Sequence, residues 1–214
     1  MFSADLRAAT WSDHQKAEST AYLEALMRGQ LSLGQYAEMV AQHYFAYVVL
    51  EEAAAVMRRD PVASVFAVPE LDRLPALEAD LAYLLGDGWA GQITASASTE
   101  RYCARLREVC FGWPGGFVAH HYTRYLGDLS GGQFIRKSVA RTYGLTTGGV
   151  AFYDFPEIGD LKAFKIQYRD ALDAAPWTAE EQQRIITETA LAYELNTDVL
   201  AELGTGLPGS DLAA

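Results

Sequence analysis

The stretch Tyr122-Thr-Arg-Tyr-Leu-Gly-Asp-Leu-Ser-Gly-Gly-Gln133 places three glycines inside a segment whose other residues favour a helix. Each helical glycine costs about 1 kcal/mol relative to alanine, and a domain is stable by only ~5–15 kcal/mol, so something must require them. Gly127, Gly131 and Gly132 share one helix face with Asp128. This face presents bare backbone and one carboxylate. Two interpretations stay open: close packing of a neighbouring helix, or a flat ligand lying on the backbone.

The rest of the chain is also punctuated as helices, because each long apolar-periodic stretch begins at a capping residue and ends at glycine or proline. The expected helices run from Ser3 to about Arg28, from Ser32 to before Asp60, near Leu71 to Leu85, from near Thr99 to Phe111, from Phe117 to Tyr143, from Asp160 to about Ala174, and from Thr178 to Leu203. No alternating run competes as a strand. We therefore predict an all-α fold of six to eight helices in one domain, residues 1–204, followed by a flexible tail, residues 205–214.

Composition limits the classes of partner. The 214 residues are 50% hydrophobic, which is typical of a globular domain, and carry 17 Lys and Arg against 28 Asp and Glu, a net charge of -11. Such a surface repels nucleic acid, so an anionic ligand must meet a local basic cluster. No segment has the apolar length of a membrane span or a secretion signal, which predicts a cytoplasmic protein without a membrane partner. Cys103 and Cys110 are expected to be buried small hydrophobes.

A second group of residues lies near the start of the chain. Arg7, His14 and Glu18 share one face of the first expected helix. Glu18 is one turn from His14, so it can determine which ring nitrogen carries the proton and leave the other for a metal. Arg7 lies two turns earlier and could meet an anionic edge of a planar cofactor. A hydrogen-bonded structural histidine is the alternative. On spacing alone the other histidines are equal candidates: His43, His120 and His121.

A third group is a basic stripe in this acidic chain. Lys162, Lys165 and Arg169 stand at positions i, i+3 and i+7 of one expected helix. A solvated helix face explains such stripes. The stripe could equally supply the local anion site that the net charge demands.

Together these groups resemble the haem oxygenase family in its soluble bacterial form, from about Asp5 to Leu203. The most specific signature is Tyr125-Leu-Gly-Asp-Leu-Ser-Gly-Gly-Gln133, and His14-Gln-Lys-Ala-Glu18 supports it in the correct order and distance. Further family motifs are matched by Tyr47-Val-Val-Leu-Glu-Glu52, Phe152-Tyr-Asp-Phe155, Lys165-x-x-Tyr-Arg169 and Leu195-Asn196.

The resemblance implies that haem b is sandwiched between a proximal N-terminal helix and a glycine-kinked distal helix. His14 is then the iron ligand and Glu18 its hydrogen-bonding partner. The distal backbone covering the haem is that of Gly127, Gly131 and Gly132. The propionates are expected to meet Arg7, Tyr122, Lys165 and Arg169. A water network above the iron is expected to be held by Asp128, Tyr47, Arg124 and Asn196. The other histidines match no ligand position and are expected to have structural roles. Departures from the family pattern are Tyr193 and Leu200 in place of phenylalanine and Arg7 in place of lysine.

The resemblance also implies the reaction. Haem is both substrate and cofactor, O2 is the co-substrate, and the products are biliverdin, ferrous iron and carbon monoxide. Asp128 is expected to supply, through water, the proton that oxygen activation requires. Lys165 and Arg169 are expected to fix the rotation of the haem and favour cleavage at the α-meso carbon. Because no flavin or nucleotide fingerprint is present, we expect an external donor: ferredoxin, flavodoxin or an NADPH-dependent reductase.

Three alternatives are weighed against this interpretation. A haem carrier or sensor would use the same histidine and basic stripe without needing a carboxylate on a water network. A thiaminase-type enzyme of similar all-α shape would require a reactive cysteine in a pocket. A di-iron carboxylate bundle requires Glu-x-x-His pairs, and the sequence has none.

Overall fold

The computed structural model describes residues 1–207, which form helices joined by loops and contain no strand. The α-helices are α1 (Phe2–Ala9), α2 (Trp11–Glu18), α3 (Ala21–Met27), α4 (Leu33–Met57), α5 (Leu74–Leu85), α6 (Ala97–Val109), α7 (Pro114–His121), α8 (Gly131–Tyr143), α9 (Leu161–Ala174) and α10 (Ala179–Leu203). The all-α fold expected from the sequence is therefore confirmed.

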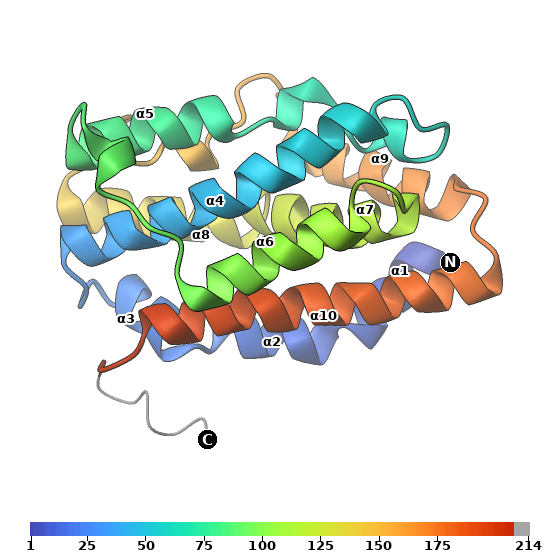
Figure 1. Ribbon diagram of the computed structural model, residues 1–214, viewed down its shortest axis with the longest axis horizontal. Coiled ribbons are helices and arrows are strands. Elements are labelled where there is room, and N and C mark those ends of the chain that lie inside the picture. Colours follow the sequence, from blue (N-terminus) through green and yellow to red (C-terminus); the bar gives the residue numbers. More distant parts are fainter. Residues whose placement is uncertain (208–214) are drawn as a thin grey trace.

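The two longest helices are α4 and α10. Ser32 forms a reciprocal capping box with Gln35 at the start of α4, and the Thr178 side chain caps α10. In Figure 1, α5 and α10 lie along opposite edges, and α4 and α6 cross between them. Helix α10 packs against α2, α6 and α7, while α4 packs against α5, α6 and α7. Segments from both ends of the sequence thus surround α7 and residues 127–132, the glycine-bearing segment that follows it.

The helix expected from Phe117 to Tyr143 is interrupted. After α7 the chain forms one turn of π-helix, η4 (Tyr122–Leu126), returns briefly to α-helix, and then turns at Leu129 and Ser130 before α8 begins. The expected C-terminal glycine cap is confirmed, because Gly144 is left-handed with φ 68°. A π-turn changes the direction in which side chains project, so the residues around Asp128 do not lie on the face of one regular helix.

The helix expected from Ser3 to Arg28 is likewise divided, into α1, α2 and α3. Helix α1 ends at Thr10, where α2 begins. Both the backbone N–H of Thr10 and its hydroxyl donate to the carbonyl of Leu6, at 3.1 and 2.8 Å. A second break at Ser19 and Thr20 precedes α3. These divisions raise the number of helical segments above the six to eight expected.

The core contains many large aromatic side chains, and one of its buried ionic groups is centred on Glu188. The Glu188 carboxylate of α10 accepts two hydrogen bonds from Arg105 of α6 and lies 3.0 Å from His120 Nε2 of α7. Arg105 and His120 hold the pKa of Glu188 down to about 2, although its burial opposes this. Cys103 and Cys110 are buried free thiols, as expected. The ionic group joins three helices behind the glycine-bearing segment.

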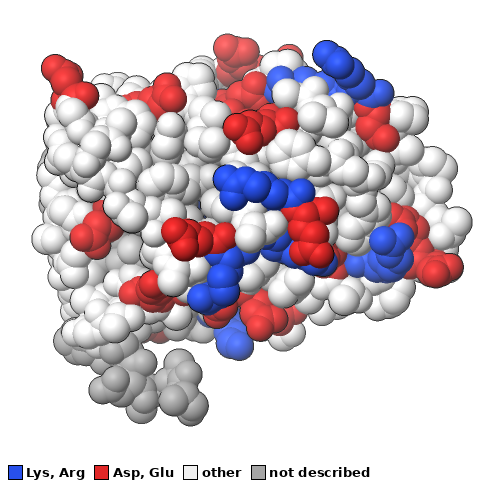
Figure 2. All heavy atoms as spheres, in the orientation of Figure 1, with Lys and Arg blue, Asp and Glu red and all other residues white. Residues whose placement is uncertain are grey.

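The surface carries mixed charge on the face formed by α4, α6 and α10. Figure 2 shows basic side chains there lying among acidic ones, without a continuous basic patch on that face. No helix among residues 1–207 has the length and apolar character needed to cross a membrane. Of the tail expected at 205–214, residues 205–207 form a turn and 208–214 lie outside the described residues.

Candidate functional site

A cleft lies between α2 and the glycine-bearing segment 127–132, and it has two adjoining parts. The inner cavity has a volume of about 130 Å³ and is bordered by α2, α4, α10 and the glycine-bearing segment. The outer cavity continues from it toward the start of the chain. Residues that border both parts are His14, Glu18, Gly127, Gly131 and Tyr193. The glycines of the distal segment and the pair His14 and Glu18 therefore border the same cleft.

His14 is held from three sides. Its Nδ1 atom is buried and lies 3.5 Å from Glu18 Oε2. Trp11 stacks on the imidazole at 5.2 Å between ring centroids, and Tyr193 meets it edge-on at 5.8 Å. Since Nδ1 faces Glu18, the remaining nitrogen, Nε2, is the one available toward the cleft. This is the arrangement that a histidine needs to ligate a metal while a carboxylate accepts its other N–H.

The three glycines of this segment differ in what surrounds them. A Cβ atom at Gly127 would meet nothing within 4 Å, and one at Gly131 would meet only Glu18 Oε1 at 3.8 Å. A Cβ atom at Gly132 would instead lie 3.1 Å from the Tyr153 ring. A side chain at Gly132 would therefore be crowded by the Tyr153 ring. Gly127 and Gly131 leave the backbone bare toward the cleft, as a flat ligand would need.

This difference predicts opposite effects for two alanine substitutions. Gly127→Ala should keep or raise the stability of the ligand-free protein by up to about 1 kcal/mol, because alanine favours the helix, and should weaken haem binding because its methyl group enters the cleft. Gly132→Ala should lower stability by about 1–3 kcal/mol, because the Tyr153 ring must move. Thermal unfolding and haem titration of both variants measure these effects. Equal loss of stability in the two variants would contradict the assignment.

Asp128 stands at the centre of a polar group in the inner cavity. The Tyr47 hydroxyl donates a short hydrogen bond to Asp128 Oδ2. The Arg124 guanidinium lies 5.0 Å from the centre of the Tyr47 ring and donates to Asn196 Oδ1. Burial raises the pKa of Asp128 to about 6, and the positive charge of Arg124 limits the rise. The structure thus brings together the four residues that the sequence analysis assigned to a water network.

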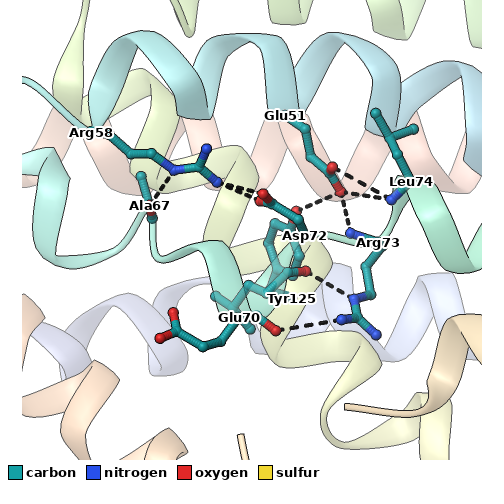
Figure 3. A network of polar contacts seen from close by, with 9 residues as sticks. Glu51, Arg58, Ala67, Glu70, Asp72, Arg73, Leu74 and Tyr125 are labelled. Carbon is teal, nitrogen blue, oxygen red and sulfur yellow. Dashed lines mark hydrogen bonds and ion pairs between the residues drawn. The ribbon is translucent and has the colours of Figure 1, made fainter. Parts of the chain in front are cut away.

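A second polar network connects the π-helix η4 to α4. The Glu51 carboxylate of α4 accepts hydrogen bonds from the backbone N–H groups of Arg73 and Leu74 at the start of α5, and the Tyr125 hydroxyl donates to it at 3.4 Å (Figure 3). Burial raises the pKa of Glu51 to about 7. The Tyr125 ring packs edge-on against Tyr47 at 5.4 Å. This network fixes the tyrosine that bonds Asp128, and sequence reasoning did not find it.

The outer cavity carries the cationic and phenolic groups expected near an anion. Arg7, Tyr122 and Arg169 all border it. Arg7 belongs to α1 and not to the helix of His14, so the expectation of one shared helix face was wrong. The Arg7 guanidinium still reaches the cleft, where it lies 5.3 Å from the centre of the Trp11 ring.

Lys165 makes a different contact from Arg169. Its Nζ atom donates to the Leu129 carbonyl at 3.0 Å and to Ser130 Oγ at 3.1 Å. In the ligand-free protein Lys165 therefore stabilises the turn in the glycine-bearing segment, where the helix leaves backbone carbonyls without partners. Lys165 as a propionate partner stays a prediction.

The histidines outside the expected ligand position divide into two kinds. His120 bonds Glu188, and His121 Nδ1 lies 2.9 Å from the Tyr168 hydroxyl, both in the core, as structural roles predict. His43 differs, because it borders the inner cavity. Trp11 and Tyr193, which hold His14, were also not assigned such a role. The i, i+3 spacing of Trp11 and His14 is the signal that could have shown the stacking.

Comparisons with known proteins show the family of this chain. The family model described as "Heme oxygenase" matches residues 1–202. The chain therefore belongs to the haem oxygenase family. It is 37% identical over 201 residues to haem oxygenase 1 of Synechocystis, covering 94% of this chain and 84% of that protein. Haem oxygenase 1 of Pongo abelii is 38% identical over 204 residues, covering 94% of this chain and 71% of that protein.

Solved structures give the same result for the fold. The crystal structure of haem oxygenase-1 from Synechocystis in complex with haem superposes with a TM-score of 0.90 at 37% identity, covering 94% of this chain and 91% of that one. The haem oxygenase structure from Leptospira interrogans superposes with a TM-score of 0.89 at 36% identity, covering 94% and 98%.

Proposed function

We propose that this protein cleaves haem b oxidatively to biliverdin, ferrous iron and carbon monoxide, using O2 and electrons from an external donor. The observation that carries the proposal is the cleft itself. One wall presents His14 with its Nε2 side free, and the other presents bare backbone at Gly127 and Gly131. A planar ring with a metal at its centre and charged groups at one edge matches these walls.

The residues present fit haem. His14 is the proposed iron ligand. Its buried Nδ1 forms no hydrogen bond within the described residues of the ligand-free protein, and Glu18 Oε2, 3.5 Å away, is the proposed acceptor for the Nδ1–H when haem is bound. Arg7, Tyr122 and Arg169 are the proposed partners of the propionates at the outer cavity. Among residues 1–207 no cluster of three His, Cys, Asp or Glu side chains could hold a metal without such a prosthetic group.

Bound haem supplies the iron at which O2 binds and the ring carbon that is oxidised. The protein's part is to deliver protons and hold water. Asp128 can take up and release a proton near neutral pH, since its pKa is raised to about 6. Tyr47 fixes the position of the carboxylate by donating to Oδ2, and Arg124 stabilises its ionised form. The glycine backbone at 127 and 131 leaves room for a ligand on the side of Asp128.

The site argues against two competing functions. Both cysteines are buried, and burial raises the pKa of each thiol, so neither is a reactive thiolate as a thiaminase-type site requires. A haem carrier has no use for the bonded set of Asp128, Tyr47 and Arg124. The identity of the reductase, the cytoplasmic location and the preference for the α-meso carbon stay predictions.

The experiment that tests the function uses the purified protein loaded with hemin under air. Addition of ascorbate, or of a ferredoxin with its reductase, should replace the Soret band by a bilin absorbance, and carbon monoxide should be released. The same mixture without O2 should retain haem. A haem complex that is reduced and reoxidised repeatedly without forming bilin would identify a carrier instead.

A further inference from the structure

His43 lies on α4 one turn before Tyr47 and borders the inner cavity. We propose that His43 is a positioning residue of this cavity, whose Nε2–H donates a hydrogen bond to a small oxygen-containing ligand or water held there. The part of the proposal that concerns ligands on iron rests on the proposed haem oxygenase function. The part that concerns the imidazole rests on the protein alone.

The Arg124 contact determines the tautomer of His43. The Nη2 atom of Arg124 lies 3.0 Å from Nδ1 of His43. A guanidinium has only donors, so Nδ1 must be the acceptor in this bond, and the proton of the neutral ring then sits on Nε2. The adjacent positive charge and burial both lower the pKa of His43 well below its ordinary value, which keeps the ring neutral. Arg124 is itself fixed by its bond to Asn196.

The Nε2 atom faces space and not protein. Nε2 of His43 has no hydrogen-bond partner among residues 1–207. Unlike the unpartnered Nδ1 atoms of His14 and His120, it is not fully buried. The side chain is otherwise enclosed, with the Phe152 ring 5.5 Å away. The inner cavity is the space that it borders in the described part of the chain. The donor is therefore presented to that cavity.

The same cavity contains the matching acceptor. Asp128 borders it with a carboxylate that keeps acceptor capacity beyond the Tyr47 bond. A buried water or small ligand needs two or more polar partners. His43 and Asp128 provide one donor and one acceptor from different helices, so a ligand between them is oriented. A leucine at position 43 would leave the Arg124 donor without its partner and the ligand without its donor.

The tautomer is tested in the haem-free protein by long-range 1H–15N correlation. We expect His43 to show the neutral Nε2–H form across the pH range in which the protein is folded, and His43→Leu assigns the signal. The Nδ1–H form, or a protonated ring at neutral pH, would overturn the proposal. This result does not depend on whether haem binds or is cleaved.

The hydrogen bond is tested in the ferric and ferrous haem complexes with azide and carbon monoxide as probes. His43→Leu should weaken azide binding about tenfold, the effect of one lost hydrogen bond, and raise the C–O stretching frequency. His43→Gln, which keeps an acceptor toward Arg124 and a donor toward the cavity, should restore both. His121→Leu is the matched control, since this buried neutral histidine does not border the described cavities.

If His43→Leu and His121→Leu give the wild-type azide affinity and C–O frequency alike, His43 donates to no ligand and the proposal is wrong. If His43→Leu does not fold, the glutamine variant and the tautomer measurement still decide. A haem complex that keeps its axial histidine in His14→Ala would instead contradict the proposed site, and it would leave the tautomer result intact.

Discussion

His14→Ala is expected to remove the axial nitrogen from bound haem and to abolish bilin formation. The imidazole is held in one orientation, because it is stacked on Trp11, faces Tyr193 and has its Nδ1 atom directed at Glu18. Loss of a partner that only orients a metal ligand typically costs 10–100-fold, so loss of the ligand itself should reduce turnover by more than about a hundredfold. Resonance Raman spectra of the ferrous complex should lose the iron–histidine stretch.

Two controls separate ligation from folding. Added imidazole should restore the axial signal in His14→Ala, because the truncated side chain leaves room in the cleft. His121→Leu should retain both the signal and turnover. Persistence of the iron–histidine stretch in His14→Ala would assign the ligand to another histidine.

Asp128→Asn is expected to bind haem with near wild-type affinity and to lose bilin formation by about 10²–10⁴-fold, the usual contribution of a positioned acid or base. Asparagine can still accept the Tyr47 hydrogen bond but cannot deliver a proton. Single-turnover absorbance with hemin and reductant measures the bilin rate. Bilin formation at the wild-type rate in Asp128→Asn would remove this carboxyl group from the reaction.

The pH dependence has a definite sign. The pKa of Asp128 is about 6, so the protonated fraction falls as pH rises from 6 to 8. If this group supplies the proton, the wild-type bilin rate should fall over that range, and the fall should be absent from the residual rate of Asp128→Asn.

The raised pKa of Asp128 also predicts that Asp128→Asn is more stable than the wild-type protein. The pKa of Asp128 is raised by folding from 3.8 to about 6, so its contribution to stability is fully present below pH 3.8 and is lost as pH rises through 6. Removing the ionisable group should therefore stabilise the haem-free protein above pH 6 by up to about 3 kcal/mol. Denaturant unfolding at pH 7.5 and pH 4 should show the gain only at the higher pH.

Local signals were enough to predict most of the helices. The capping residues Ser32, Asp160 and Thr178 act within three residues of themselves, and Gly144 ends α8 by its own backbone preference. The break at Thr10 and the π-turn before Asp128 were not predicted. The turn that follows Asp128 is held by a contact with a distant helix, the Lys165 bond to the Leu129 carbonyl, and such a contact leaves no periodic signal in sequence.

The site shows the same division. His14 and Glu18 are one helical turn apart, so their pairing is visible in the sequence. Tyr47 and Asp128, and likewise His43 and Arg124, are 81 residues apart and meet only because α4 packs beside the glycine-bearing segment. The resemblance predicted the first of these pairs without its geometry. The different reasons for Gly127 and Gly132 could be separated only by their surroundings.

The central claim is that haem lies in the cleft between α2 and the glycine-bearing segment. A crystal structure of the hemin complex tests it most directly. We expect iron bonded to His14 Nε2, the backbone of Gly127 and Gly131 against the opposite face, and the propionates toward Arg7 and Arg169. Haem bound elsewhere on the molecule, with side chains filling this cleft, would contradict it.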